Sequence, residues 1–307
     1  MLCLLLAAAL PWLYWDHPAS TAASLKQAGI ERLYVPAGQE DAWKALGFDA
    51  RVLDATHAAK AAPPGVRYRM DIAAATNVPW VDANGWRFER DSGRTYYYDV
   101  PSRKAALAAA EAYAYGADAA IHPEDRDLTA FGKMLKFLRE IDQPGMKTLA
   151  NIGVIDDGSG MTGEALNLLA RRNLLFRLVK APDPKLDLNI QIGRPEFPKS
   201  DAANPARFAA LVRRKLTDEK RLVRVFGSDI VLVHLTGDDT HVRLHLINYG
   251  GGKVEGLRVR VRGPFFQGKL AAYGLPDAAL MDYGSSDNGT EFTIPALDVY
   301  AVVDLTK

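Results

Sequence analysis

The pattern of apolar and polar positions changes near residue 225. Before this point, strand-like apolar runs alternate with amphipathic helical segments. After it, no convincing long helix is indicated, and arginine and histidine alternate with branched apolar residues in segments 230–236, 241–249 and 257–262. Alternation with a period of two is typical of half-buried antiparallel strands. The chain is therefore predicted to be α/β in its first part and all-β in its last part, which we expect to be an antiparallel β-sandwich.

The first part is predicted to contain parallel β/α units, because strand and helix patterns follow each other in turn. Glycines end the first two helices, at Gly29 and Gly47. Predicted strands are 12–16, 30–35, 48–53, 118–122 and 149–155, and predicted helices are 20–28, 39–46, 105–115, 127–141, 162–173 and 204–216. Residues 56–100 are less regular, and Asn84-Gly85 predicts a turn there. We expect a β/α barrel-like domain over 1–145, a second α/β domain over 146–225 and the β-sandwich over 226–307.

Composition and charge exclude little. Of the 307 residues, 48% are hydrophobic and 24% charged, as in ordinary soluble domains, and the net charge of +1 gives no general attraction to nucleic acid. Cys3 is the only cysteine, which excludes an internal disulfide framework and a zinc cluster built on cysteine. The apolar run 2–10 fits either the core of a secretion signal or the approach to a first buried strand, so export is left open.

Polar side chains follow several predicted strands. In parallel β/α folds the loops after the strands converge on the ligand. The residues collected there are Asp16, His17, Asp54, His57, His122, Glu124, Asp125, Asp156 and Asp157. Paired carboxylates can cleave glycosides as acid and as base or nucleophile. The alternative is that they are ordinary turn and capping residues.

Tryptophan and tyrosine are dense near residues 80–98. Their rings suit the apolar faces of sugars, and Trp15, Trp80, Trp86, Tyr96 and Tyr98 are the candidates; the alternative is that they pack in the core. Glu111 lies in an alanine-rich helix that is predicted to be buried, so it needs a partner. Glu89, His241 and His245 are predicted on exposed strand faces. The glycine-rich loop 157–163 matches no nucleotide-binding motif and is expected to be a flexible connection.

Three segments together resemble known enzymes. Residues 108–121, which follow Asn84-Gly85-Trp86, look like the later units of barrel-type glycoside hydrolases. Residues 152–157 and 168–176 resemble the glutamine-amidotransferase-like domain of beta-galactosidase-type enzymes, although the chain offers no cysteine nucleophile there. The tail, with 245–249 and 299–304, is similar to their terminal β-sandwich. A full barrel needs about 250 residues, and only about 145 precede the amidotransferase-like part. The barrel is therefore expected to be shortened, or merged with the middle units into one open sheet.

The resemblance implies a glycoside-hydrolase-like protein that acts on an oligosaccharide. Glu124 is the expected proton donor, and Asp156 or Asp157 the expected nucleophile or base. Residues expected to contact substrate are Asp16, His17, Trp80, Trp86 and His122. The alternative is a non-catalytic relative that binds a carbohydrate or a protein. No cofactor, metal, nucleic-acid partner or membrane span is expected, and assembly into a homo-oligomer is left open.

Overall fold

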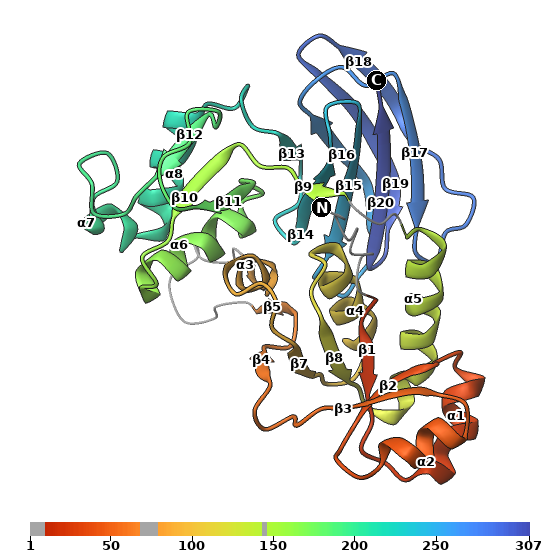
Figure 1. Ribbon diagram of the computed structural model, residues 1–307. Coiled ribbons are helices and arrows are strands. Elements are labelled where there is room, and N and C mark those ends of the chain that lie inside the picture. Colours follow the sequence, from red (N-terminus) through yellow and green to blue (C-terminus); the bar gives the residue numbers. More distant parts are fainter. Residues whose placement is uncertain (1–9, 68–78, 143–145) are drawn as a thin grey trace, which may run out of the picture. The chain divides into compact units, whose positions relative to one another are not determined.

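The chain folds into two compact units. The computed structural model describes residues 10–67, 79–142 and 146–307 (Figure 1). The first unit comprises residues 1–65 and 91–145, and the second comprises 66–90 and 146–307. The apolar run predicted as a signal or a strand lies mostly outside the described residues, since these begin at Leu10. The three-domain division stays a prediction.

The first unit is built on an open parallel sheet of six strands in the order β3-β2-β1-β8-β7-β4. The strands are β1 (Trp12–Tyr14), β2 (Arg32–Val35), β3 (Asp49–Val52), β4 (Ala59–Ala61), β7 (Tyr96–Asp99) and β8 (Ala119–His122). All of their pairings are parallel. If the two edges of the sheet were joined, the strands would follow one another in chain order, because β3 lies at one edge and β4 at the other. This is the order of a barrel opened between β3 and β4, and it confirms the predicted parallel β/α part.

The two faces of this sheet differ in chemistry. One face carries fully buried side chains, among them Leu13, Leu33, Tyr98 and Ile121. The opposite face carries an aromatic cluster of Trp12, Tyr14, Tyr34 and Tyr97 with Ala120. Because alternate residues of a strand point to opposite faces, the run Tyr96-Tyr97-Tyr98 divides between the two.

Helices follow the strands of the first unit. They are α1 (Ala22–Gln27), α2 (Glu40–Ala45), α4 (Ala105–Ala114) and α5 (Leu128–Glu140), with short 3-10 turns η1 (Ala19–Thr21) and η3 (Asp125–Asp127). All ten residues of α4 are buried, and α4 lies beside α5 (Figure 1). Helix α5 also approaches the end of α1 so closely that a Cβ atom on Gly132 would lie 1.7 Å from the carbonyl oxygen of Ala28. Glycine is therefore required at this crossing.

The second unit contains a separate three-stranded parallel sheet in the order β11-β10-β12. Its strands are β10 (Ile152–Ile155), β11 (Phe176–Val179) and β12 (Leu188–Ile190), and its helices are α3 (Gly85–Arg90), α6 (Gly160–Arg171), α7 (Lys199–Ala202) and α8 (Pro205–Leu216). A short pair, β5 (Gly65–Arg67) and β6 (Trp80–Asp82), forms its own two-stranded sheet. Side chains of Trp86, Ile152, Leu166 and Phe208 share one core. The middle strands thus do not join the six-stranded sheet.

The rest of the second unit is the predicted β-sandwich. One antiparallel sheet has the order β13-β16-β19-β18 and the other β17-β20-β15-β14-β9. The strands are β9 (Lys147–Thr148), β13 (Val223–Val225), β14 (Val231–Gly237), β15 (His241–Asn248), β16 (Val254–Val261), β17 (Gln267–Ala272), β18 (Met281–Ser286), β19 (Gly289–Leu297) and β20 (Tyr300–Thr306). Apolar residues of both sheets, such as Leu244, Val259 and Phe292, form one core. Arg258 and Arg262 are exposed beside buried Val259 and Val261, as the alternation predicts.

Three local predictions were wrong. Asn84-Gly85 forms no hairpin turn; helix α3 begins at Gly85, and the carbonyl of Asn84 accepts the N–H groups of Arg87 and Phe88. Glu89 therefore lies in a helix instead of a strand. His245 is buried instead of exposed, because β15 is the inner neighbour of β14 and β20 and the sheet is covered on its second face, where α6 contacts β14.

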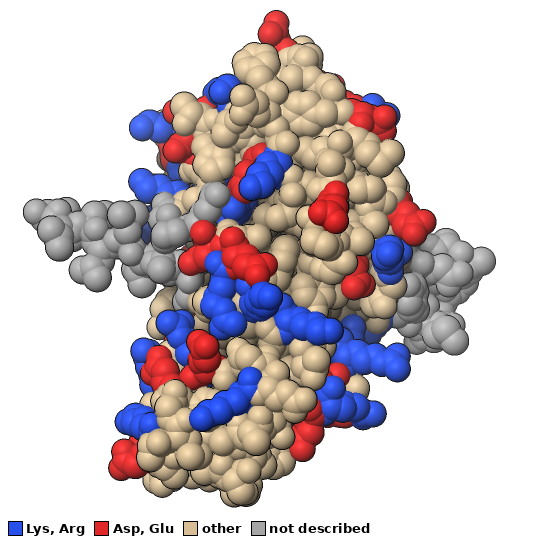
Figure 2. Space-filling model, turned by 90° about the vertical axis from the view of Figure 1, so that its right-hand side faces the viewer, with Lys and Arg blue, Asp and Glu red and all other residues tan. Residues whose placement is uncertain are grey.

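The face drawn in Figure 2 carries charges of both signs. Several basic side chains lie side by side across its middle, and acidic side chains lie above and below them. This agrees with the net charge of +1.

Candidate functional site

His122 occupies the centre of a polar cluster at the carboxyl edge of the six-stranded sheet. It is the last residue of β8. Its Nε2 atom lies 3.6 Å from Oδ1 of Asp16, which follows β1, and its Nδ1 atom lies 3.4 Å from Oδ1 of Asp99, the last residue of β7. The hydroxyl of Tyr97 is 2.9 Å from the same Nδ1 atom. Three neighbouring strands thus bring two carboxylates and a phenol to one imidazole.

A second histidine extends the cluster. Nε2 of His17 lies 3.3 Å from Oδ1 of Asp125. The ring of His17 packs on Trp15 with centroids 4.4 Å apart. Trp15 is itself fixed, because its indole N–H donates to Thr21. Asp16, His17 and His122, which are predicted to contact substrate, are therefore brought together by the fold.

Tyrosine rings wall the cluster on the sheet side. Tyr14 meets Tyr97 edge-on at 5.1 Å between centroids and meets His122 at 5.5 Å. Burial, followed by the carboxylates of Asp99 and Asp16 and by Tyr14, raises the pKa of Tyr97 far above its usual value. Its phenol is therefore neutral near pH 7 and can donate to Nδ1 of His122.

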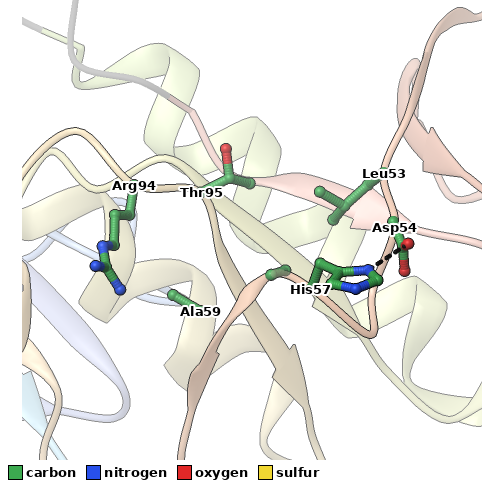
Figure 3. Close-up of a pocket in the computed structure, with 7 residues that line it drawn as sticks. Leu53, Asp54, His57, Ala59, Arg94 and Thr95 are labelled. Atoms are coloured by element: carbon green, nitrogen blue, oxygen red, sulfur yellow. Dashed lines mark hydrogen bonds and ion pairs between the residues drawn. The ribbon is translucent and has the colours of Figure 1, made fainter.

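Tyr14 links this cluster to a second group of residues. Burial chiefly raises the pKa of Tyr14, and the carboxylates of Asp16 and Asp54 raise it further. Asp54 lies on the rim of a cavity of about 700 Å³ between the residues that follow β3 and those at the start of β4 and β7 (Figure 3). The cavity is lined by Leu53, Asp54, His57, Ala58, Ala59, Arg94 and Thr95. Leu53 and Ala58 also pack against the aromatic cluster, so the cavity and the cluster share a wall.

The cavity rim carries opposite charges. Oδ2 of Asp54 is 2.7 Å from Nδ1 of His57, the pair joined by the dashed line in Figure 3, and Thr56 donates to the other oxygen. Hydrogen bonds from Thr56 and then His57 lower the pKa of Asp54 well below its usual value. Arg94 lies across the cavity from Asp54 (Figure 3). A polar ligand would thus meet a fixed anion and a cation.

Glu124, the predicted proton donor, lies in the first unit after β8. Its carboxylate accepts the N–H of Ser102 at 2.9 Å and pairs with Arg126. Hydrogen bonding from Arg126 and then from Ser102 lowers the pKa of Glu124. A general acid instead benefits from a raised pKa. Its catalytic role stays a prediction that this environment does not favour.

Asp156 and Asp157 lie in the second unit and have structural partners. Arg90 donates two hydrogen bonds of 2.8 Å to Asp156, and a third reaches the carbonyl of Ser159. Asp157 accepts from the N–H of Ser159 and the hydroxyl of Thr162, which lowers its pKa to about 2. The loop 157–163 is thus the capped start of α6. Catalytic roles for both aspartates stay predictions.

The two predicted sugar-binding tryptophans also belong to the second unit. The guanidinium of Arg171 lies 3.5 Å from the ring centroid of Trp80. Trp86 is 8% exposed and belongs to the core under α6. Trp86 thus packs in the core, which is the alternative to sugar contact that the sequence leaves open. Substrate contact by either tryptophan stays a prediction.

Sequence reasoning missed Tyr97 and Asp99. Residues 95–100 carry a β-prone pattern, and Asp99 ends that run as Asp16 ends the first one. The same rule that selected Asp16 would therefore have found Asp99. Tyr97 could have been separated from Tyr96 and Tyr98 by its opposite face.

Buried Glu111 has the partner that its position demands. Tyr98, on the covered face of β7, donates a 2.7 Å hydrogen bond to Oε2 of Glu111 in α4. Within residues 10–67, 79–142 and 146–307, no cluster of three or more histidine, cysteine or acidic side chains could hold a metal ion. The helices of the described part of the chain are also too short or too polar to cross a membrane.

Comparison with known proteins gives information about the fold only. No family model and no curated protein matches the sequence. An alpha-L-fucosidase isoenzyme from Paenibacillus thiaminolyticus is similar in structure over 71% of this chain and 62% of its own, at 9% identity and a TM-score of 0.54. Beta-galactosidases from Rahnella and from Bacillus circulans each match 96% of this chain and 60% of theirs, at 8% and 10% identity and TM-scores of 0.39 and 0.40. The chain thus spans about 60% of the length of these enzymes. The fold is glycoside-hydrolase-like.

Proposed function

We propose that this protein binds an oligosaccharide at the carboxyl edge of its six-stranded sheet and hydrolyses a glycosidic bond there. The observation that carries the proposal is the placement of His122 between Asp16 and Asp99. The strand order of an opened barrel supports it, because barrels hold their substrates at this edge. The structural likeness to a fucosidase supports the substrate class.

The cluster has the chemistry that a sugar requires. Tyr14 and Tyr97 are each 7% exposed and pack against His122, so they support the imidazole from the sheet side and leave contact with the sugar to the polar groups. Carboxylates and imidazoles accept or donate hydrogen bonds to hydroxyl groups, and Asp16, Asp99 and His122 supply these. The adjoining cavity of about 700 Å³ gives room for further sugar units.

The two carboxylates also suit hydrolysis. Asp16 and Asp99 contact the same imidazole at 3.6 Å and 3.4 Å, and inverting glycosidases use a pair of carboxyl groups roughly 6.5–9.5 Å apart. In that reaction one carboxyl group protonates the leaving oxygen while the other carboxylate takes a proton from the attacking water. We assign these two roles to Asp16 and Asp99. The alternative assignment, which follows from the positions of polar residues after predicted strands, gives the acid role to Glu124 and the other to Asp156 or Asp157.

A second candidate function is binding without cleavage. It is favoured by the lowered pKa values of Asp54 and Glu124, which hold two carboxyl groups of this edge as anions. In this version the protein recognises a carbohydrate and the amidotransferase-like and sandwich parts serve as accessory domains. The same residues contact the sugar, but no product forms.

One experiment separates the outcomes. A panel of oligosaccharides and aryl glycosides is tested for binding by calorimetry and for release of reducing sugar, with wild type, Asp16→Asn, Asp99→Asn and Asp277→Asn. Asp277 is an exposed aspartate of the second unit and serves as the matched control. Hydrolysis that both site variants abolish supports the first function, and binding without release supports the second. Absence of binding throughout the panel, or equal loss in Asp277→Asn, contradicts both.

A further inference from the structure

A hollow rich in arginine lies in the second unit. Its volume is about 600 Å³, and it is formed where helix α8 ends and the chain leads into β13. The lining includes four arginines: Arg213 and Arg214 in the last turn of α8, and Arg221 and Arg224 farther along the chain. Asp218 and Glu219 are the acidic residues of the lining.

The acidic residues do not neutralise the arginines. Asp218 lies 3.6 Å from Arg221 and 3.4 Å from Arg224, so one carboxylate serves both guanidinium groups. Arg213 and Arg214 form no ion pair with the described residues. Four cations against two anions leave the hollow with an excess of positive charge.

One of the four positive charges, that of Arg221, is largely buried. It is 9% exposed, and its Nε atom is buried without a hydrogen-bond partner among the described residues. Burial chiefly lowers the pKa of Arg221, and the neighbouring charge of Arg213 lowers it further. A buried donor without a partner and a repulsive neighbour both cost free energy. An anion beside them would offset both costs.

The aromatic wall orients one arginine. The guanidinium carbon of Arg224 lies 4.9 Å from the ring centroid of Phe226, and that of Arg258 lies 5.7 Å from the same ring. Such stacking leaves the N–H edge of a guanidinium free to face a ligand. Arg224 can thus present its planar donor edge toward the hollow.

We propose that this hollow is a binding site for an oxyanion of phosphate or sulfate chemistry. Guanidinium groups bind such tetrahedral anions through paired N–H donors, and several around one cavity favour a doubly charged ligand. Arg213 and Arg214 are exposed at a helix end, where they also stabilise the helix dipole. Arg221 donates from one terminal nitrogen to the carbonyl of Arg172 and pairs through the other with Asp218, which leaves its Nε donor for an anion. The volume also admits a phosphate or sulfate ester of a small molecule.

The test uses the full chain with inorganic phosphate, inorganic sulfate and glucose 6-phosphate, and chloride as the reference ion. Binding is measured by calorimetry at low ionic strength. The variant Arg213→Gln/Arg214→Gln removes two lining charges, and Lys215→Gln removes a charge from the same helical turn outside the lining. Arg221→Lys keeps the buried charge but removes the Nε donor.

We expect saturable binding that the double variant weakens at least tenfold and that Lys215→Gln leaves unchanged. Arg221→Lys should weaken it while the circular dichroism spectrum stays that of the wild type. Tighter binding of glucose 6-phosphate identifies an ester ligand, and equal or tighter binding of inorganic phosphate identifies the free ion. Absence of saturable binding, or equal weakening by Lys215→Gln, overturns the site. Because all of these residues lie in the second unit, failure here leaves the carbohydrate proposal untouched.

Discussion

The hydroxyl of Tyr97 lies 2.9 Å from Nδ1 of His122. The same Nδ1 atom lies 3.4 Å from Oδ1 of Asp99, and Nε2 lies 3.6 Å from Oδ1 of Asp16. The phenol and the two carboxylates thus hold the imidazole of His122 in one orientation at the end of β8.

Tyr97→Phe should therefore weaken oligosaccharide binding about tenfold and lower the free energy of unfolding by about 1 kcal/mol, the net value of one hydrogen bond. Calorimetry and urea denaturation measure the two effects. Tyr96→Phe is the matched control, because its hydroxyl donates to the carbonyl of Asp91 and its side chain occupies the other face of β7. Equal loss of binding in both variants would show that the Tyr97 bond has no special role.

Gly132→Ala should destabilise the protein although alanine is the better helix former. The new Cβ atom would lie 1.7 Å from the carbonyl oxygen of Ala28, so α5 must move. Overpacking of this kind costs about 1–3 kcal/mol, against a gain in helix propensity of about 1 kcal/mol. Gly160→Ala in α6 meets nothing within 4 Å and should be neutral or stabilising. Thermal unfolding of both variants checks the sign, and a stable Gly132→Ala protein would contradict the close crossing.

Tyr98→Phe should lower the free energy of unfolding by more than the removal of a solvent-exposed hydroxyl group would. It removes a donor from the fully buried carboxylate of Glu111. Removing one partner of a buried hydrogen bond costs about 1–3 kcal/mol. The double variant Tyr98→Phe/Glu111→Gln should lose less than the sum of the single variants, and hydrogen exchange of the β7 and α4 amides measures each loss. Strict additivity would mean that the two side chains are not coupled.

Asp157 should contribute stability that depends on pH. Its pKa is lowered from 3.8 to about 2 in the folded protein by Ser159 and Thr162. A depressed folded-state pKa gives stability that is fully present above the unfolded value and is lost as the pH falls toward the folded value. The melting temperature of wild type should exceed that of Asp157→Asn above about pH 5, and the difference should shrink between about pH 4 and pH 2. A difference that is constant over this range would exclude the carboxylate as its source.

The architecture follows from the sequence because its signals are local. Gly29 and Gly47 end helices, the alternation around Val259 marks a half-buried strand, and both features depend on the nearest neighbours alone. Asn84 misleads because the same dipeptide that opens a hairpin can also begin a helix, as it does for α3. The prediction that His245 is exposed was wrong because an alternation with a period of two shows which residues share a face of the sheet. It does not show whether other elements cover that face.

The candidate site could be predicted only in part. Asp16, His17 and His122 follow from the rule for strand ends, since the parallel sheet places those ends at one edge. The pairing of Asp156 with Arg90 could not be predicted, because 66 residues separate them and only the folded chain brings them together. Arg221 and its neighbours show no sequence motif, since their excess charge depends on which of them the fold buries.

The position of a bound sugar tests the central claim most directly. The imidazole resonances of the full chain are followed by NMR during titration with the tightest-binding oligosaccharide. The account predicts that the signals of His122 and His17 shift to saturation, whereas those of His245, which is buried between Thr236 and Tyr300 in the second unit, stay in place. Saturable binding that leaves His122 and His17 unmoved would contradict a carbohydrate site at the carboxyl edge of the six-stranded sheet.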